Sequence, residues 1–144
     1  MKDLRVITDL QFGSTGKGLF AGYLANIIKP NLIVTAWAPN AGHTFVDADG
    51  RKHVNIALPS GIVANPDYIL LGPGSVIDPD RFFLEVEHYR KMGINSTILI
   101  HEHAAVLMRH HAVDESKYGF KIGSTMKGVG EATTNAVVTA SILI

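Results

Sequence analysis

The most constraining feature of the chain is a strand, a glycine-rich turn, a helix and a second strand that follow one another near its start. Residues 5–10 read Arg-Val-Ile-Thr-Asp-Leu, a β-branched run typical of a buried strand. Residues 11–18 form the glycine-rich turn, residues 19–28 carry apolar side chains at helical spacing, and residues 32–36 read as the second strand. This order is the βαβ pattern of a parallel sheet. The sequence therefore predicts an α/β fold, mainly a parallel sheet with flanking helices.

The same alternation continues along the rest of the chain. Asp78 followed by Pro79 predicts the start of a helix, because Asp caps a helix and Pro suits its first position. Gly93 predicts the end of that helix. The other expected elements are a hairpin whose arms are residues 45–46 and 53–56, strands at residues 68–71 and 97–100, a helix over residues 104–113 and a glycine-rich loop over residues 122–130.

Composition narrows the class of protein. The chain has 144 residues, 47% of them apolar and 18% charged, which suits one compact globular domain. Its 13 basic and 13 acidic residues cancel, so composition gives no support for a nucleic-acid or membrane partner. Without cysteine there is no disulfide and no thiolate metal site. No secretory signal pattern is present, so a cytoplasmic location is expected. The apolar run at residues 137–144 is more typical of an interrupted chain than of a finished terminus.

The strongest local signal for chemistry is Gly-Ser-Thr-Gly-Lys-Gly at residues 13–18, between the predicted strand and helix. Glycines let backbone N–H groups turn toward an anion, and the helix N-terminus adds the positive end of its dipole. Lys17 can place a charge on phosphate oxygens. The spacing is shorter than in a Walker A motif, and Gly18 replaces the usual Ser or Thr. We interpret this loop as a P-loop-like phosphate-binding turn after the first strand; the alternative is an ordinary strand-to-helix turn.

Two further loops carry candidate functional residues. Residues 39–44 read Pro-Asn-Ala-Gly-His-Thr and follow the second strand at its carboxyl end, where ligands collect in parallel sheets, so they are expected to face the first loop. His43 can donate a hydrogen bond or a proton to developing negative charge; the alternative is a loop histidine with local hydrogen bonds. Residues 123–130 combine hydroxyls, a lysine and three glycines, which also suit an anion.

Other features favour structural roles. Trp37 at a strand end and the amphipathic helix over residues 81–90 are interpreted as packing elements. Four histidines lie close together in the sequence, but their spacing places neighbours on different helix faces and no carboxylates complete a metal site. We interpret these as surface or structural residues: His101, His103, His110 and His111.

Five motifs, in order, resemble those of adenylosuccinate synthetases. Residues 11–18 resemble that family's Q-W-G-D-E-G-K-G loop, and residues 40–44 are identical to its N-A-G-H-T. Residues 58–62, 72–79 and 122–130 are similar to its I-P-S-G-I, G-N-G-V-V-x-D-P and I-G-T-T-G-R-G-I-G. The resemblance runs over nearly the whole chain. It implies that residues 1–144 are the N-terminal part of a nucleotide-binding domain in a ligase that joins aspartate to a purine nucleotide.

The first loop departs from the ordinary family pattern. Ser14 and Thr15 stand where ordinary members carry Asp-Glu, and that Asp takes the proton from hypoxanthine N1 and ligates magnesium. The substitution resembles the bacteriophage branch of the family, which makes 2-amino-2′-deoxyadenylosuccinate from dGMP, aspartate and ATP. A small neutral serine leaves room for the guanine C2 amine, whereas a carboxylate would crowd it. We therefore expect dGMP rather than IMP; the alternatives are an ordinary synthetase using IMP and GTP, and a non-catalytic nucleotide-binding fragment.

The resemblance also implies cofactors and site residues. The cofactor is Mg²⁺, held in part by Ser14 and the Gly42 carbonyl, and the phosphoryl donor is ATP or GTP. The implied catalytic residues are Ser14, Lys17 and His43. The implied nucleotide-binding residues are Gly13, Ser14, Thr15, Gly16, Lys17, Gly18, Gly42, His43 and Thr44. The implied contacts to the substrate nucleotide come from Ser14, Asn40, Ser124 and Thr125.

The resemblance also sets limits on what this chain can do by itself. The family's aspartate-binding loop and its base-recognising segment for the triphosphate lie beyond residue 144, and complete members form homodimers with shared active sites. After Gly130 the family reads P-A-Y-x-D-K, whereas this chain reads E-A-T-T-N-A, and Met126-Lys127 replaces Gly-Arg. We expect weak or no turnover from residues 1–144 alone.

Overall fold

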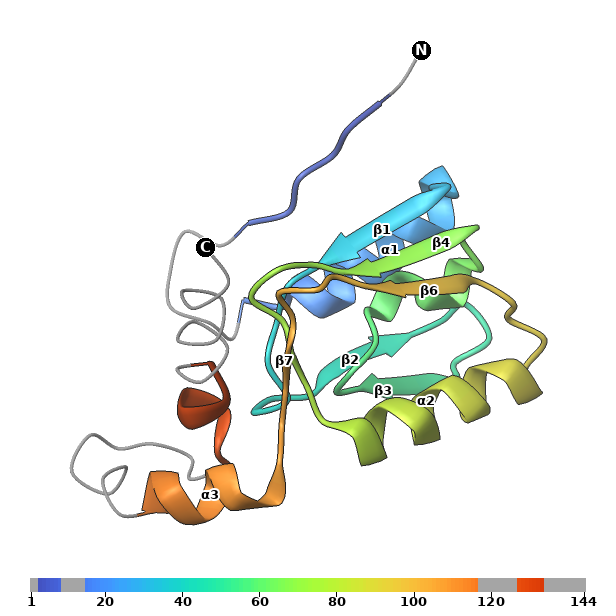
Figure 1. The fold of residues 1–144 in the computed structure, drawn as a ribbon. Helices are drawn as coiled ribbons and strands as arrows, with labels where there is room; N and C mark the ends of the chain where they lie inside the picture. Colours follow the sequence, from blue (N-terminus) through green and yellow to red (C-terminus); the bar gives the residue numbers. More distant parts are fainter. Residues whose placement is uncertain (1–2, 9–14, 117–126, 134–144) are drawn as a thin grey trace.

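The fold is described from a computed structural model over residues 3–8, 15–116 and 127–133. Its centre is a sheet of three parallel strands in the order β1-β4-β6 (Figure 1). Leu32 lies opposite Tyr68, which lies opposite Thr97, so all three strands end at the same edge of the sheet. The strands are β1 (Leu32–Thr35), β4 (Tyr68–Leu71) and β6 (Thr97–Ile100).

The remaining elements surround this sheet and extend from its carboxyl edge. An antiparallel hairpin, β2–β3, runs beside the helix α2, and a short parallel pair, β5–β7, continues beyond the carboxyl edge (Figure 1). In the part of the chain that the structure describes, no helix is both long and apolar enough to cross a bilayer. The bounds are α1 (Lys17–Ile28), β2 (His43–Val46), β3 (Lys52–Asn55), η1 (Ser60–Ala64), β5 (Val76–Ile77), α2 (Pro79–Lys91), β7 (Ala105–Val106) and α3 (Arg109–Ser116).

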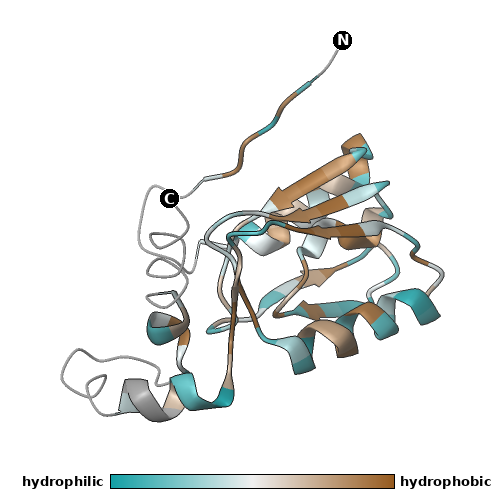
Figure 2. Cartoon of the chain, viewed as in Figure 1, coloured by the Kyte–Doolittle hydropathy of each residue, from teal (hydrophilic) through white to brown (hydrophobic). Residues whose placement is uncertain are grey.

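The core lies against one face of the sheet. Ile69 and Leu71 of β4 are fully buried and pack with apolar side chains from η1, from α2 and from the segments beside them. The opposite face is apolar but exposed: Val34 and Tyr68 keep 58% and 48% of their surface open among the described residues. Figure 2 colours much of β1 and β6 as hydrophobic residues. Within residues 3–8, 15–116 and 127–133 the sheet is therefore covered on one side, although parallel strands ordinarily bury both of their faces.

Helix α1 packs through its smallest residues. Gly18, Gly22 and Ala25 are buried, at a spacing that places them on one face of the helix. A Cβ at Gly22 would lie 2.6 Å from the Phe45 ring, so only glycine allows β2 to approach this closely. The start of α1 is thereby held against the start of β2, where the candidate site residues lie.

The prediction of a buried first strand over residues 5–10 is wrong for its described part. Residues 3–8 form no strand, and Val6 is 77% exposed. A β-branched run favours extended backbone, but a strand also needs a hydrogen-bonded neighbour and a surface to cover it. In the described chain β1 pairs with β4 alone, and residues 3–8 pair with neither. The turn predicted to bind phosphate therefore precedes α1 without following a described strand.

The predicted helix over residues 104–113 is also partly wrong. Ala105–Val106 form β7 and pair in parallel with Val76–Ile77, and α3 begins only at Arg109. This pairing joins segments almost thirty residues apart, so local helical spacing gives no sign of it. The other expected strands and the helix after Asp78 are confirmed: the Asp78 carboxylate accepts from two backbone N–H groups, and Gly93 adopts a positive φ.

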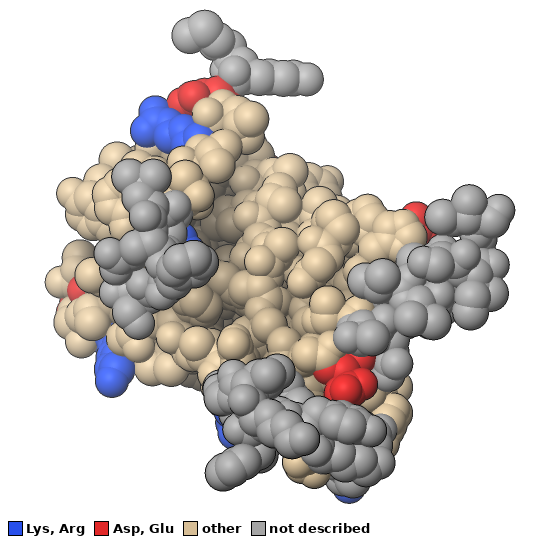
Figure 3. Space-filling view, turned by 90° about the vertical axis from the view of Figure 1, so that its left-hand side faces the viewer, with Lys and Arg blue, Asp and Glu red and all other residues tan. Residues whose placement is uncertain are grey.

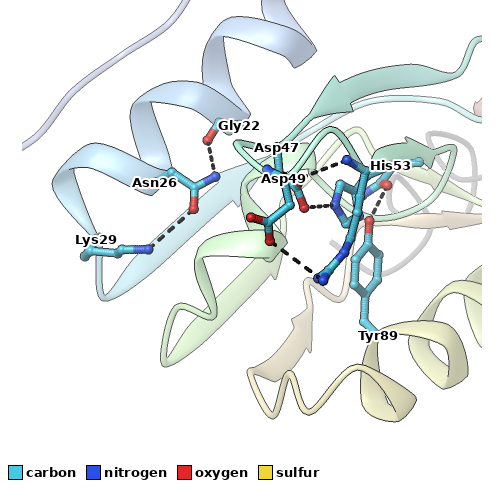
Figure 4. Close-up of polar contacts among 9 residues, drawn as sticks. Gly22, Asn26, Lys29, Asp47, Asp49, His53 and Tyr89 are labelled. Carbon is cyan, nitrogen blue, oxygen red and sulfur yellow. Dashed lines mark hydrogen bonds and ion pairs between the residues drawn. The ribbon is translucent and has the colours of Figure 1, made fainter.

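Buried polar contacts tie the hairpin to α2. Asp47 closes the hairpin turn by accepting from the backbone N–H of Asp49 and of Arg51, and its other oxygen lies 3.0 Å from His53 Nε2 (Figure 4). The hydrogen bond from His53 lowers the pKa of Asp47. On the other side of His53, the Tyr89 hydroxyl donates to Oδ1 of the fully buried Asn55 at 2.6 Å.

Replacing Tyr89 by phenylalanine is expected to lower the free energy of unfolding by about 1–3 kcal/mol, because Asn55 Oδ1 loses its buried donor. Burial, with a smaller contribution from the Glu85 charge, raises the pKa of Tyr89 from 10.0 to about 12. The folded state favours the neutral phenol, so this stabilisation is complete below pH 10 and is lost as the pH rises toward 12. Urea unfolding at pH 8 and pH 11 measures both effects. The exposed Tyr68→Phe is the control; a Tyr89→Phe curve that tracks it at both pH values contradicts the assignment.

Candidate nucleotide-binding site

The first turn of α1 presents backbone donors to its surroundings. Gly16 precedes the helix in the left-handed region at φ 79°, and no described side chain caps the first turn. The Gly16 carbonyl accepts from the Phe20 N–H, as the first helical bond does. The backbone N–H groups of residues 18 and 19 precede that bond, and the first turn of a helix provides no carbonyl of its own for such donors. With the positive end of the helix dipole, they suit an anion such as phosphate.

His43 lies directly against this turn. A Cβ at Gly18 would be 2.7 Å from His43 Cβ and 3.1 Å from its Nδ1, so the helix backbone touches the histidine side chain. His43 is half-buried, and this burial lowers its pKa; the nearby Lys17 ammonium lowers it further. The expectation that the loop after the second strand faces the start of the helix is confirmed for the described residues.

Trp37 holds the other contact with His43. The two rings are stacked, with centroids 4.0 Å apart and planes inclined by 13°. The indole N–H donates a long hydrogen bond, 3.4 Å, to the carbonyl of Ala57, and the Trp37 carbonyl accepts from the N–H of Val76 at 3.0 Å. The sequence interpretation of Trp37 as a packing residue missed this contact, since nothing in a strand-end tryptophan shows which ring it meets.

Glu85 on α2 fixes the segment that Trp37 contacts. Its two carboxylate oxygens accept from the backbone N–H groups of three consecutive residues, at 2.6 to 3.2 Å: Ile56, Ala57 and Leu58. Charge-assisted hydrogen bonds of this kind are stronger than neutral ones. One glutamate thus sets the path of the chain between the hairpin and η1.

Lys127 and Gly128, at the described end of the predicted glycine-rich loop over residues 122–130, also lie near these residues. Lys127 Nζ donates to the carbonyl of Asn40 at 3.1 Å, which joins two segments 87 residues apart in the sequence. Gly128 follows at φ 81°, and a Cβ there would lie 2.5 Å from the backbone nitrogen of Ala112. The chain therefore brings three of its predicted functional segments to the carboxyl edge of the sheet. Figure 3 looks onto that side, where the visible described surface is mostly uncharged.

The other predicted site residues divide into two groups. Thr15, Gly16, Gly42 and Thr44 are exposed beside Lys17, Gly18 and His43. No group of three histidines, aspartates or glutamates that could hold a metal gathers among residues 3–8, 15–116 and 127–133. His111 is buried and its Nδ1 accepts from the N–H of Met108, which is a structural role. Outside the described residues lie Gly13, Ser14, Ser124 and Thr125.

Comparison with known proteins identifies the family. The family model described as adenylosuccinate synthetase matches residues 6–143, almost the entire chain. This chain belongs to the adenylosuccinate synthetase family. Three relatives, from two phages and one bacterium, are compared with this chain below.

The N6-succino-2-amino-2′-deoxyadenylate synthase of Salmonella phage PMBT28 is 43% identical over 132 residues, which are 91% of this chain and 36% of that protein. The adenylosuccinate synthetase of Thermus thermophilus is 40% identical over 126 residues, 88% of this chain and 30% of that protein. The solved succinoaminodeoxyadenylate synthetase of Cyanophage S-2L is 42% identical with a TM-score of 0.74, covering 90% of this chain and 36% of that one; it is described as bound to dGMP and to dATP as an energy donor. The chain thus spans about a third of the length of the relatives it matches. The shared α/β fold agrees with the predicted fold class.

Proposed function

We propose that this chain supplies the N-terminal nucleotide-binding part of a ligase that joins L-aspartate to dGMP with hydrolysis of ATP. The product is N6-succino-2-amino-2′-deoxyadenylate, formed through a 6-phosphoryl intermediate. The observation that carries the proposal is the 42% identity to a phage synthetase described with dGMP and an adenine nucleotide bound. The complete protein acts in the cytoplasm, that of the host if it is phage-encoded, and is a homodimer.

The triphosphate lies at the start of α1 in this proposal. Lys17 and the first-turn N–H groups supply positive charge and donors at one point, and Gly18 lets His43 approach to contact distance. Glycine residues of the loop leave the backbone accessible to the phosphates. His43, at the start of β2, donates a hydrogen bond to the purine 6-oxygen and to the transferring phosphoryl group.

The residues present fit a magnesium ion bound together with the nucleotide. Mg²⁺ prefers oxygen ligands and is commonly held by one or two protein groups plus substrate phosphates rather than by a cage of carboxylates. The exposed Gly42 beside His43 offers a backbone carbonyl, and Ser14 offers a hydroxyl. When bound, the ion neutralises charge on the phosphate oxygens.

Two steps complete the chemistry. The purine N1 gives up its proton to solvent as the 6-oxygen attacks the γ-phosphorus; the bond to the β-phosphate oxygen breaks, and ADP leaves. The neutral aspartate amine then attacks C6, displaces inorganic phosphate and loses one proton to solvent. Positioning and charge stabilisation carry most of the catalysis in such transfers. Lys17 and His43 act on the phosphoryl group, whereas Asn40, Ser124 and Thr125 hold the substrate nucleotide.

The choice of dGMP over IMP rests on Ser14. A serine beside the purine N1 leaves space for the C2 amine of guanine, where an aspartate would clash. The identity to the Thermus enzyme, 40%, keeps IMP as the alternative substrate.

A chimera tests this proposal: residues 1–144 replace the corresponding segment of the Cyanophage S-2L synthetase. With L-aspartate, Mg²⁺ and ATP, dATP or GTP, we expect a succinyl product from dGMP and little from IMP. Ser14→Asp in the same chimera is expected to shift preference toward IMP, and Ser116→Asp is the control for an added carboxylate. Product from IMP alone contradicts the dGMP proposal, and binding without turnover favours the non-catalytic fragment.

A further inference from the structure

The orientation of His43 requires an explanation, because the ring torsion of histidine is intrinsically broad. Within the part of the chain that the structure describes, two contacts restrict the His43 ring. The Gly18 backbone lies against His43 Cβ, Cγ and Nδ1, and the Trp37 ring covers one face of the imidazole at a centroid distance of 4.0 Å. The planes are inclined by only 13°, so a partial rotation of either ring would break the stack, whereas a half-turn of the imidazole would keep it. The stack therefore selects the plane of the imidazole ring.

Trp37 is itself fixed at two points. Its carbonyl accepts from Val76 N–H at 3.0 Å, which ties its backbone to β5. Its indole N–H points to the carbonyl of Ala57, whose own N–H lies within 3.2 Å of both Glu85 oxygens. The 3.4 Å indole bond is weak, so the stacking and the backbone contact hold most of the position. A packing residue would need only an apolar environment, whereas this indole has a defined ring partner and a defined polar partner.

We propose that Trp37 is a positioning residue for His43: its indole fixes the plane of the imidazole that faces the nucleotide. The role of His43 at the nucleotide rests on the proposed function. The orientation of its ring by Trp37 does not, and can be tested on the chain without ligand. Aromatic pairs are worth about 0.5–1.5 kcal/mol beyond their buried area, so loss of the stack should change the population of the correct ring orientation roughly two- to twelvefold. A phenylalanine can restore the stack but not the N–H bond.

Nuclear magnetic resonance of the free chain tests the geometry. In histidine-labelled chain at fixed pH, the His43 ring protons are expected upfield of their ordinary position because they lie over the indole face; His43→Gln assigns them. Trp37→Leu should abolish this upfield displacement, Trp37→Phe should retain part of it, and the exposed Phe83→Leu should leave it unchanged. The other six of the seven histidines report whether each variant keeps the fold.

Calorimetry of dGMP with MgATP measures the consequence on the same variants. We expect Trp37→Leu to weaken binding two- to twelvefold, with partial recovery in Trp37→Phe and no change in Phe83→Leu. An unchanged His43 signal in Trp37→Leu overturns the inference, and so does loss of the signal without loss of affinity. If the parent chain binds neither nucleotide, the proposed function fails for this chain, and an upfield displacement that is absent from the parent chain then overturns the inference.

Discussion

Replacing Lys17 by alanine is expected to weaken ATP binding by the chain roughly 10- to 100-fold, the range for losing a charge-assisted contact of about 1.5–3 kcal/mol. Lys17 opens α1, where the dipole and the first-turn N–H groups already favour an anion. Its charge also reaches His43, whose pKa it lowers in addition to the larger effect of burial. Removing the ammonium takes away the one side-chain cation at the predicted phosphate loop.

Lys29→Ala is the matched control, because Lys29 follows the same helix at its other end and its ammonium contacts Asn26 at 3.4 Å. Both variants lose one positive charge, so a general electrostatic effect would weaken binding equally. Isothermal titration with MgATP distinguishes the two. Equal affinities for the two variants would place the triphosphate away from the start of α1.

Replacing Glu85 by glutamine is expected to lower the free energy of unfolding by about 2–3 kcal/mol. The carboxylate accepts from three backbone N–H groups in sequence, and glutamine keeps only one acceptor oxygen. The side-chain amide N–H groups of the glutamine would face the backbone N–H groups of residues 56–58, and donors cannot bond donors. At least one of these backbone N–H groups is then left without a partner. Because this segment contacts Trp37, the same change should also disturb the Trp37–His43 stack.

Glu87→Gln provides the comparison on the same helix. Among the described residues Glu87 pairs with Lys91 alone, 2.7 Å away, and both side chains are largely exposed, so the expected cost is about a few tenths of a kcal/mol. Urea unfolding of the two variants gives the difference directly. Similar midpoints for Glu85→Gln and Glu87→Gln would show that the backbone contacts of Glu85 contribute little.

Much of the fold follows from local sequence signals. Residues 68–71 and 97–100 are short β-branched or apolar runs with turn residues beside them, and both are strands. The start of α2 is set by Asp78 and Pro79, and its end by Gly93. Each of these residues affects only the neighbouring helical turn, so its effect does not depend on the rest of the molecule. The predictions that fail, at residues 5–10 and 104–113, concern segments whose state depends on a partner strand far away in the sequence.

The site is predictable to a similar degree. The proximity of Lys17 and His43 follows from topology, because a loop after a parallel strand and the start of a packed helix meet at the same edge. Trp37 and Glu85 were not predicted as site residues, since their partners are a ring and backbone groups that only the folded chain brings near. Lys127 belongs to a predicted loop, yet its bond to Asn40 depends on how that loop folds back.

The central claim is that the start of α1 and residues 40–44 form one nucleotide site. Amide ¹⁵N–¹H spectra of the chain, titrated with MgATP and dGMP, test it most directly. We predict that the largest shifts fall on the amides of residues 16–20 and 40–44, and that Lys17→Ala suppresses both groups together. Shifts confined to one of these segments, or located on α2 and β6 instead, would contradict the claim.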